Sequence, residues 1–408
     1  MSHTIAMLSV HTSPLDSPGR TKDAGGMNVY IRELATELGR RGDTIDIFTR
    51  RTNEQTPHIV QLAPNVRVIH IKAGPQVPVH KNSLVAYIPS FAARIAAFAN
   101  MESRRYDVLH SHYWLSGIAA AQLARRWDIP HVTMFHTLAR LKQLANPSEQ
   151  ESQQRLYMEQ CLLQSVDRVI AATIDERTQM TRYCGASASR IDVIPCGVDL
   201  KLFVLSDRYE AREQFGLDPQ QPVLFFAGRL DPFKGPDILL RAAAMMEEEA
   251  QIVVVGGALT GDEDLQNLRT LATELGIEQR VRFLGAQPHH VLPLLYSAAD
   301  VTVVPSYHES FGLVAVESLA CGTPVVATRA GGLTTIVHNN ENGYLVPRCP
   351  GFFAERLDVI LRNPDIHMRM RTSARRSILQ FSWQNVAYQV HEMYADLVSE
   401  PRVAELFS

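Results

Sequence analysis

Cysteine is scarce in this sequence, and none of its cysteines form a pair at the C-x-x-C spacing. The five that occur are odd in number and widely spaced, which argues against a disulfide framework and against a zinc site. They are Cys161, Cys184, Cys196, Cys321 and Cys349. We expect them to be reduced thiols in the core or in loops.

A strong excess of charge of either sign and a long apolar run are also missing. The formal net charge of -3 disfavours a dedicated nucleic-acid binder, because phosphate recognition needs a concentrated basic face. No uninterrupted apolar run reaches about 18 residues, and the start of the chain has no secretory leader pattern. We therefore expect a cytoplasmic enzyme without stable membrane insertion.

The chain is long enough for two domains, since 408 residues exceed what one hydrophobic core usually serves. Short β-rich runs alternate with amphipathic helical patterns, and this alternation restarts near residue 222. We predict an α/β fold of two Rossmann-like, doubly wound parallel-sheet domains, residues 1–198 and 199–382, with a ligand cleft between them at the carboxyl ends of the strands. The amphipathic segment 383–408 either completes the first domain or packs within the second.

The second half carries two motifs that suit a nucleotide sugar. In GRLDPFKG, Arg229 and Lys234 follow a predicted strand and could bind a diphosphate, although a solvated turn is the simpler interpretation of the octapeptide alone. Glu309 and Glu317 form an E-x7-E pair, with Glu309 expected on the loop before a helix that starts near Phe311. Carboxylates can accept hydrogen bonds from sugar and ribose hydroxyls, yet isolated helical glutamates are usually surface groups.

The backbone between these glutamates is expected to present N–H groups at the start of the helix, where an anion is favoured. The residues concerned are Ser310, Phe311, Gly312 and Leu313.

The first half offers weaker signals at its predicted strand ends. Gly25 and Gly26 precede a helix and would allow a close backbone approach to a phosphate, with Asn28 in the first helical turn. Histidine and tyrosine gather in HSHYWLSG (110–117) and FHTLAR (135–140). For any single histidine there, a structural role is the simpler interpretation, with a catalytic role as the alternative.

Two further patterns are set aside. GDEDL (261–265) contains the D-x-D spacing that can hold a divalent metal, but it stands directly before a helix and is better interpreted as an N-cap with first-turn acids. VVVGGAL (253–259) lacks the G-x-G-x-x-G spacing of a dinucleotide site. The sequence therefore gives no support for a metal or a redox cofactor.

Taken in order, GGMNVYI, HSHYWLSG, FHTLAR, GRLDPFKG and HESFGLVAVES resemble the retaining glycosyltransferases of family 4, which have the GT-B fold. The resemblance spans nearly the whole chain. Within the family, HTSPLDSPG and GGMNVYI are similar to the branch that transfers N-acetylglucosamine from its UDP donor to 1D-myo-inositol 3-phosphate. Sucrose-phosphate synthases, which use UDP-glucose and fructose 6-phosphate, are near relatives and typically carry GGQ where this chain has GGMN.

The resemblance implies a role for each matching residue. Arg229 and Lys234 would hold the diphosphate together with Gly26, Glu317 the ribose, and Glu309 the donor sugar. His136 would lie against the donor sugar near the reacting carbon. The acceptor and its phosphate would be held by Asn28, Lys81, Tyr113, Thr137 and Arg155.

The resemblance also implies that no metal or other cofactor is required, and that a homodimer forms. The partners would be a UDP-sugar and a phosphorylated small molecule, without nucleic acid. Three alternatives stay open: sucrose-phosphate synthesis, a membrane-associated lipid glycosyltransferase using the weakly basic segment LARLKQLA (138–145), and a non-catalytic binding module. Epimerases and glycogen-type phosphorylases share the fold.

Overall fold

The computed structural model describes residues 2–16, 25–259 and 261–400. The chain divides into two compact units, and it passes from the first to the second between Pro195 and Cys196 and returns after Ser382. The first unit therefore contains most of the chain up to Pro195 together with helix α15 (Trp383–Ser399). The domain boundary expected between residues 198 and 199 lies three residues after the first of these crossings.

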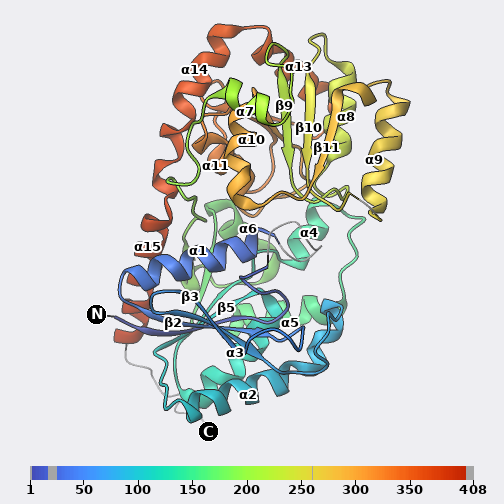
Figure 1. The fold of residues 1–408 in the computed structure, drawn as a ribbon. Coiled ribbons are helices and arrows are strands. Elements are labelled where there is room, and N and C mark those ends of the chain that lie inside the picture. Colours follow the sequence, from blue (N-terminus) through green and yellow to red (C-terminus); the bar gives the residue numbers. More distant parts are fainter. Residues whose placement is uncertain (1, 17–24, 260, 401–408) are drawn as a thin grey trace. The chain divides into compact units, whose positions relative to one another are not determined.

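An eight-stranded sheet, which includes β2, β3 and β5, forms the centre of the first unit (Figure 1). Its strand order is β3-β4-β2-β1-β5-β6-β7-β8. Its strands are β1 (Thr4–Ser9), β2 (Thr44–Arg50), β3 (Ile59–Ala63), β4 (Val66–Ile71), β5 (Val108–His112), β6 (His131–Met134), β7 (Arg168–Ala171) and β8 (Ile191–Val193). Its helices besides α15 are α1 (Gly26–Arg40), α2 (Ile88–Met101), α3 (Tyr113–Trp127), α4 (Ala139–Ala145), α5 (Gln153–Ser165) and α6 (Ile174–Cys184), with a 3₁₀ helix η1 (Lys81–Tyr87) before α2.

Strand β3 is the exception to the parallel pairing of this sheet. This edge strand pairs antiparallel with β4, and a short turn through Asn65, at φ 60°, connects the two. An antiparallel neighbour can follow after so short a turn, whereas a parallel one needs a crossover. The strand was missed because its side chains are only partly buried or exposed, so that it lacks the apolar run of the other strands.

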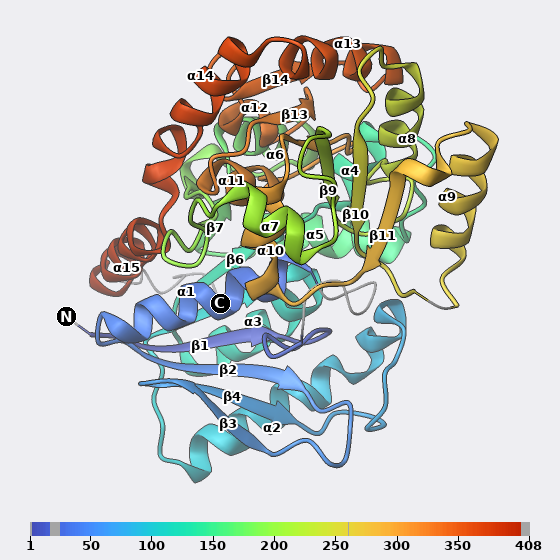
Figure 2. The same cartoon turned by 45° about the horizontal axis from the view of Figure 1, so that its top comes forward.

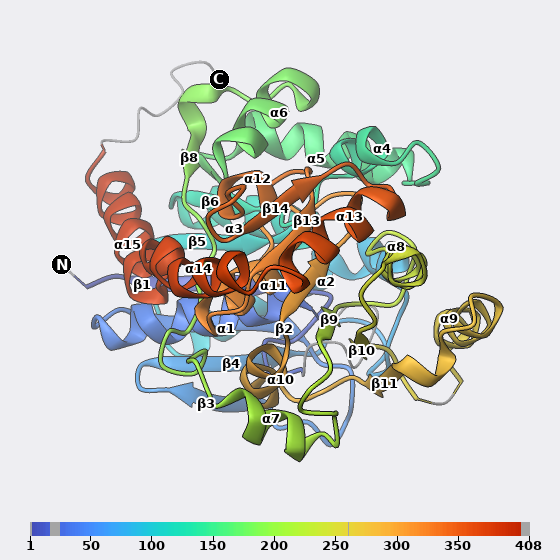
Figure 3. The ribbon, with the colours of Figure 1, turned by 90° about the horizontal axis from the view of Figure 1, so that it is seen from above.

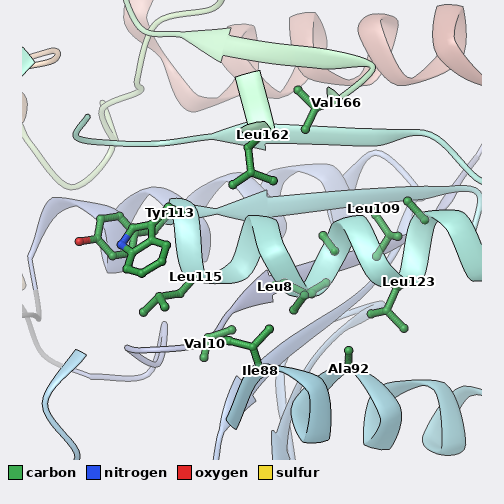
Figure 4. Packing of buried hydrophobic residues seen from close by; sticks show 14 of the residues in the cluster. Leu8, Val10, Ile88, Ala92, Leu109, Tyr113, Leu115, Leu123, Leu162 and Val166 are labelled. Atoms are coloured by element: carbon green, nitrogen blue, oxygen red, sulfur yellow. The ribbon is translucent and has the colours of Figure 1, made fainter. Parts of the chain in front are cut away.

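Helices cover both faces of this sheet, with α1 on one side and α2 on the other (Figure 2). Leu8 and Leu109 point to the side of α2 and α3, where they share one hydrophobic cluster with Ile88 and Leu123 (Figure 4). Because successive side chains of a strand alternate between faces, Met7 is buried on the opposite face. Both faces of the central strands are therefore buried.

One segment of the first unit, Lys81–Met101, is long and apolar enough to cross a membrane by length and composition alone. In the structure it comprises η1 and α2, and the inward side of α2, including Phe91 and Ile95, packs in the hydrophobic cluster of the sheet. Buried core helices of soluble domains can have the same length and apolar composition. The finding is therefore weak evidence for a membrane span.

The question left open for the C-terminal helix is answered by its contacts. The hydroxyl of Tyr394 on α15 lies 2.6 Å from His110 Nδ1 on β5, and His391 Nδ1 lies 2.9 Å from Asp43 Oδ2. Helix α15 therefore packs on the first unit. The predicted residues 401–408 of this segment lie outside the described residues.

The second unit contains a six-stranded parallel sheet in the order β11-β10-β9-β12-β13-β14. Strands β9, β10, β11, β13 and β14 of this sheet are labelled in Figure 3. Its strands are β9 (Val223–Ala227), β10 (Gln251–Val255), β11 (Val281–Gly285), β12 (Val301–Val304), β13 (Val325–Thr328) and β14 (Gly343–Val346). Its helices are α7 (Arg208–Gln214), α8 (Pro236–Met245), α9 (Glu263–Glu274), α10 (Leu292–Ala298), α11 (Leu313–Ala320), α12 (Leu333–Ile336), α13 (Pro350–Leu361) and α14 (Pro364–Ala374).

Strand β9 illustrates how this sheet is buried on both faces. Leu224 and Phe226 belong to the cluster that includes side chains of α8, α9 and α13, whereas the ring of Phe225 contacts Tyr296 of α10 at 5.0 Å. Parallel sheets need such cover on both sides. Asp262 caps α9 through Leu265 N, which confirms the N-cap interpretation of GDEDL.

Candidate functional site

The first unit gathers aromatic and imidazole side chains where β1, β5 and β6 end. His11 follows β1, Tyr113 follows β5, and His136 follows β6. Tyr113 and His136 have left-handed backbone conformations, with φ of 73° and 60°. This conformation is strained in residues other than glycine and persists only where the surrounding structure holds it. Such strained residues are concentrated at functional sites.

Burial lowers the pKa of both His112 and His136, so these two side chains are neutral near pH 7. His112 Nδ1 lies 3.1 Å from His136 Nε2, and the ring of His11 lies against that of Tyr113 at 4.5 Å. Burial, reinforced by the neighbouring His11, lowers the pKa of His136 to about 3. A neutral imidazole can donate at one nitrogen and accept at the other, so His136 can bind a hydroxyl group but carries no charge.

Arg155 on α5 connects the predicted acceptor residues. Its guanidinium lies 4.9 Å from the centre of the Tyr113 ring, and Nη2 donates to Thr137 O at 2.9 Å and to Thr137 Oγ1 at 3.3 Å. Two carboxylates already neutralise it, because Nε donates to Glu159 at 2.6 Å and Nη1 lies 2.9 Å from Glu151. The structure therefore brings the predicted residues Arg155, Tyr113 and Thr137 together, and the side chain of Arg155 is buried.

The predicted residues Asn28, Lys81 and Gly26 occupy separate positions. Asn28 is fully buried, and its amide nitrogen donates to Thr12 Oγ1 at 2.7 Å and to Ser13 O at 2.6 Å, which fixes the segment after β1. Lys81 is the first residue of η1, and Gly26 is the first residue of α1. Residues 17–24 of the predicted glycine-rich loop lie outside the described residues.

In the second unit, Lys234 and Glu309 form a close ion pair. Lys234 Nζ donates to Glu309 Oε1 at 2.6 Å, and Ser306 Oγ donates to the same oxygen at 2.7 Å. Burial alone would raise the pKa of Glu309, but the ammonium of Lys234 and the Ser306 hydroxyl hold it below its ordinary value. The carboxylate is therefore ionised and fixed in place.

Arg229 is also paired with a carboxylate. Its Nε donates to Asp231 Oδ2 at 2.6 Å, and its side chain is 43% exposed. Asp231 Oδ1 in turn accepts from the backbone N–H groups of Phe233 and Lys234. One carboxylate thus shapes the loop and orients the exposed guanidinium beside the Lys234 backbone.

The loop after Glu309 leads into α11 two residues later than expected. The helix begins at Leu313, and Gly312 caps it at φ 112°, where a Cβ would lie 2.9 Å from Leu333 Cδ2. Ser310 and Phe311 therefore belong to the loop, and the ring of Phe311 packs against Phe381. The predicted start near Phe311 is corrected, because the left-handed glycine interrupts the helical backbone.

Glu317 lies within α11, separate from the Lys234–Glu309 pair. Its Oε1 lies 3.0 Å from His289 Nε2, and its Oε2 accepts from the Tyr296 hydroxyl at 2.9 Å. Within the described part of the chain, no hydrogen bond or ion pair links Glu317 with Arg229 or Lys234. The two glutamates of the E-x7-E pair therefore belong to different hydrogen-bond groups.

The sequence did not identify the residues that form hydrogen bonds or ion pairs with the predicted site residues. Asp231 was visible inside GRLDPFKG, where an acid beside two cations signals a pre-paired site. His289, Tyr296, Glu151 and Glu159 stand outside every motif, and nothing in the local pattern marks them. In residues 2–16, 25–259 and 261–400, no group of three or more His, Cys, Asp or Glu side chains is arranged to hold a metal ion.

Comparison with known proteins agrees with this organisation. Residues 24–202 match the family described as Glycosyltransferase Family 4, and residues 207–377 match Glycosyl transferases group 1. The chain is 43% identical to the D-inositol 3-phosphate glycosyltransferase of Xylanimonas cellulosilytica, over 96% of each chain. It is 42% identical to the protein of the same name from Nocardiopsis dassonvillei, over 96% of this chain and 94% of the relative.

Solved structures show the same architecture. The sucrose-phosphate synthase of Thermosynechococcus elongatus superposes with a TM-score of 0.90 at 33% identity, covering 97% of this chain and 99% of the other. HepE of Anabaena, in complex with UDP and glucose, gives a TM-score of 0.77 at 25% identity, covering 97% and 100%. The two parallel-sheet units are thus those of the GT-B fold, and the chain belongs to glycosyltransferase family 4 and is a glycosyl-transferring enzyme.

Proposed function

We propose that this enzyme transfers N-acetylglucosamine from its UDP donor to 1D-myo-inositol 3-phosphate, with retention at the anomeric carbon. The observation that carries the donor assignment is the Lys234–Glu309 pair, which fixes a cation and a hydroxyl-accepting carboxylate at the ends of two adjacent strands. The acceptor assignment is supported by relatives at 43% and 42% identity that are named D-inositol 3-phosphate glycosyltransferases.

On the donor side, Lys234 and Arg229 would neutralise the diphosphate, and the backbone N–H groups of Ser310 to Leu313 would donate to it. Glu309 would accept from hydroxyls of the transferred sugar, and Glu317 from the ribose diol. A carboxylate has about four acceptor sites, so Glu317 can bind a diol while it keeps His289 and Tyr296. The complex of HepE with UDP and glucose supports a UDP donor.

On the acceptor side, Arg155, Tyr113 and Thr137 would bind the phosphate, with Lys81 as a second cation. Arg155 is held by Glu159 and Glu151, so its orientation is set before binding. A fixed guanidinium loses little conformational freedom when it binds a dianion. Asn28 would act on the acceptor through the Thr12–Ser13 segment that it holds.

The chemistry would rest on orientation and charge stabilisation. Neutral His136 would hydrogen-bond the donor sugar near the reacting carbon, and the departing phosphate would accept the proton of the attacking hydroxyl on the same face. The cationic side chains would stabilise the leaving diphosphate, so we propose that no metal is needed. Full turnover in excess EDTA tests this point.

A second candidate, sucrose 6-phosphate synthesis, is favoured by one specific observation. The sucrose-phosphate synthase structure superposes on nearly the whole chain with a TM-score of 0.90. Both acceptors combine a phosphate with a polyhydroxylated ring, so the same cations would serve both. We favour inositol phosphate because the relatives with that name are more similar in sequence, at 43% against 33%.

The deciding experiment is a matrix of donors and acceptors followed by mass spectrometry. UDP-N-acetylglucosamine and UDP-glucose are each combined with 1D-myo-inositol 3-phosphate and fructose 6-phosphate. The proposal expects product from UDP-N-acetylglucosamine and 1D-myo-inositol 3-phosphate. The anomeric coupling constant of the product in NMR reports the stereochemistry. Product with UDP-glucose and fructose 6-phosphate alone selects the second candidate, and no product in any combination rejects both.

A further inference from the structure

Arg348, in the loop between β14 and α13, connects the two loops that carry the Lys234–Glu309 pair. Its Nε donates to Pro305 O at 2.9 Å, and its Nη2 donates to Pro232 O at 2.8 Å. Pro305 directly follows β12, whereas Pro232 belongs to the loop after β9. One guanidinium therefore bridges two loops that are far apart in the sequence.

Stacking and burial fix this guanidinium further. It lies 3.6 Å from the centre of the Tyr307 ring, and its side chain is 16% exposed. A planar cation at this distance over an aromatic face gains from the negative charge of the ring face. Tyr307 is two residues from Glu309, so Arg348 holds the chain immediately before the carboxylate.

The backbones of the two loops are close where Arg348 bridges them. Tyr307 N donates to Phe233 O at 2.9 Å. Gly235 has φ +75°, and a Cβ there would lie 2.5 Å from Pro305 O and 2.9 Å from Arg348 Nη2. The site thus has room for glycine alone, and it places Lys234 and Glu309 opposite each other.

We propose that Arg348 is a positioning residue of the donor site, which sets the distance between Lys234 and Glu309 without touching the donor itself. This inference rests on the proposed donor role of those two residues. Lysine cannot replace it, because one ammonium lacks the planar fork that reaches two carbonyls while stacking on a ring. Nothing in the local sequence pattern marks Arg348, since its partners lie more than 40 residues away.

The test compares Arg348→Ala with Arg356→Ala in the full-length enzyme. Arg356 is a matched control, since its guanidinium lies over the Tyr344 ring at 5.2 Å and near Glu355, away from both loops. We expect Arg348→Ala to lower kcat/KM for the UDP-sugar about 100-fold and to leave KM for the acceptor within about twofold. Arg356→Ala should stay within about twofold in both.

Two further measurements separate positioning from general loss of structure. Guanidinium ion at millimolar concentration should restore at least tenfold of the lost kcat/KM in Arg348→Ala, because it can refill the gap between the carbonyls and the ring. Hydrogen exchange should accelerate in peptides covering 228–236 and 305–312 and nowhere else in the second unit. Should Arg348→Ala not fold, Arg348→Lys and Tyr307→Leu give the kinetic and hydrogen-exchange readouts, which test the positioning role without the rescue.

Wild-type kcat/KM in these variants, or unchanged exchange in both peptides, overturns the positioning role. Loss of activity without guanidinium rescue and with exchange accelerated throughout the unit also overturns it, since that marks a structural role. Because hydrogen exchange needs no substrate, a failure of the proposed function is seen separately, as a wild-type enzyme that makes no product from any UDP-sugar.

Discussion

At the residue scale, the cations predicted to bind the donor are already paired with carboxylates, Lys234 with Glu309 and Arg229 with Asp231. A diphosphate that enters such a site shares the cations with those carboxylates. The pairs hold the positive groups at fixed positions, which reduces the reorganisation needed when negative charge develops on the leaving group. The carboxylates are thus as important to the site as the cations.

Glu309→Gln tests this point. The amide oxygen can still accept from Lys234 and Ser306, so we expect the protein to fold with an unchanged melting temperature. The lost negative charge weakens the bonds to the sugar hydroxyls and the attraction to the Lys234 ammonium, and kcat/KM should fall by about 100- to 1,000-fold. UDP release measures activity, and Glu355→Gln on the exposed face of α13 is the control. Unchanged turnover would remove Glu309 from the mechanism.

Arg155→Lys tests the acceptor assignment. Lysine keeps the charge between Glu151 and Glu159 but cannot reach Thr137 while lying over Tyr113. We expect KM for the phosphorylated acceptor to rise about tenfold or more, with KM for the donor unchanged. Initial-rate kinetics with each substrate varied give both values. Arg168→Lys, whose partners Asp192 and Glu400 are more exposed, is the control, and equal acceptor KM values in the two variants would contradict the assignment.

At the element scale, α15 is tied to the sheet of the first unit by a buried polar contact. Tyr394 is fully buried, and its hydroxyl lies 2.6 Å from His110 Nδ1 on β5. Amphipathic periodicity indicated a helix with one buried face, but not which sheet receives it. The partner depends on a side chain that precedes it by 284 residues.

Tyr394→Phe should therefore destabilise the first unit. It removes the hydroxyl and leaves the histidine nitrogen buried without its partner, which is expected to cost about 1–3 kcal/mol. Urea unfolding monitored by fluorescence measures this change. Tyr388→Phe lies on the same helix at a half-exposed position and should change the free energy of unfolding by less than about 0.5 kcal/mol. Equal effects of the two substitutions would show that the buried contact contributes nothing.

The elements of this fold were largely predictable, but the arrangement of the site residues was not. Buried strands such as β9 and β12 are continuous apolar runs, so their ends and the motifs after them could be read from the sequence. Edge strand β3 lacks such a run. Arg348 and His289 were missed because their partners come from strands and helices whose neighbours depend on strand order, which local patterns do not encode.

At the scale of the whole molecule, buried neutral histidines make stability depend on pH. Burial lowers the pKa of His110, His131 and His136 to about 3. In the unfolded chain these groups titrate near pH 6.5. Below that pH the unfolded state binds protons that the folded state does not, so the free energy of unfolding falls as the pH decreases toward 3 and is unaffected above about pH 7.

We expect a loss of up to about 4 kcal/mol per pH unit below pH 6 if all three histidines act together. Urea unfolding between pH 7.5 and 5 measures the slope. His131→Gln can keep a hydrogen bond to Ser111 and should reduce the slope by up to about 1.4 kcal/mol per pH unit. An identical slope in wild type and variant would show that His131 does not contribute to the acid sensitivity.

The route of the chain through the two units bears on how the protein is made. Synthesis proceeds from the N-terminus, and α15 is translated only after the whole stretch Cys196–Ser382. During translation the second unit can form its own core. The surface of the first unit's sheet around His110 stays uncovered until α15 has been synthesised. Stalled nascent chains that end before Trp383 should therefore bind chaperones through the earlier half, and the final helix should release them.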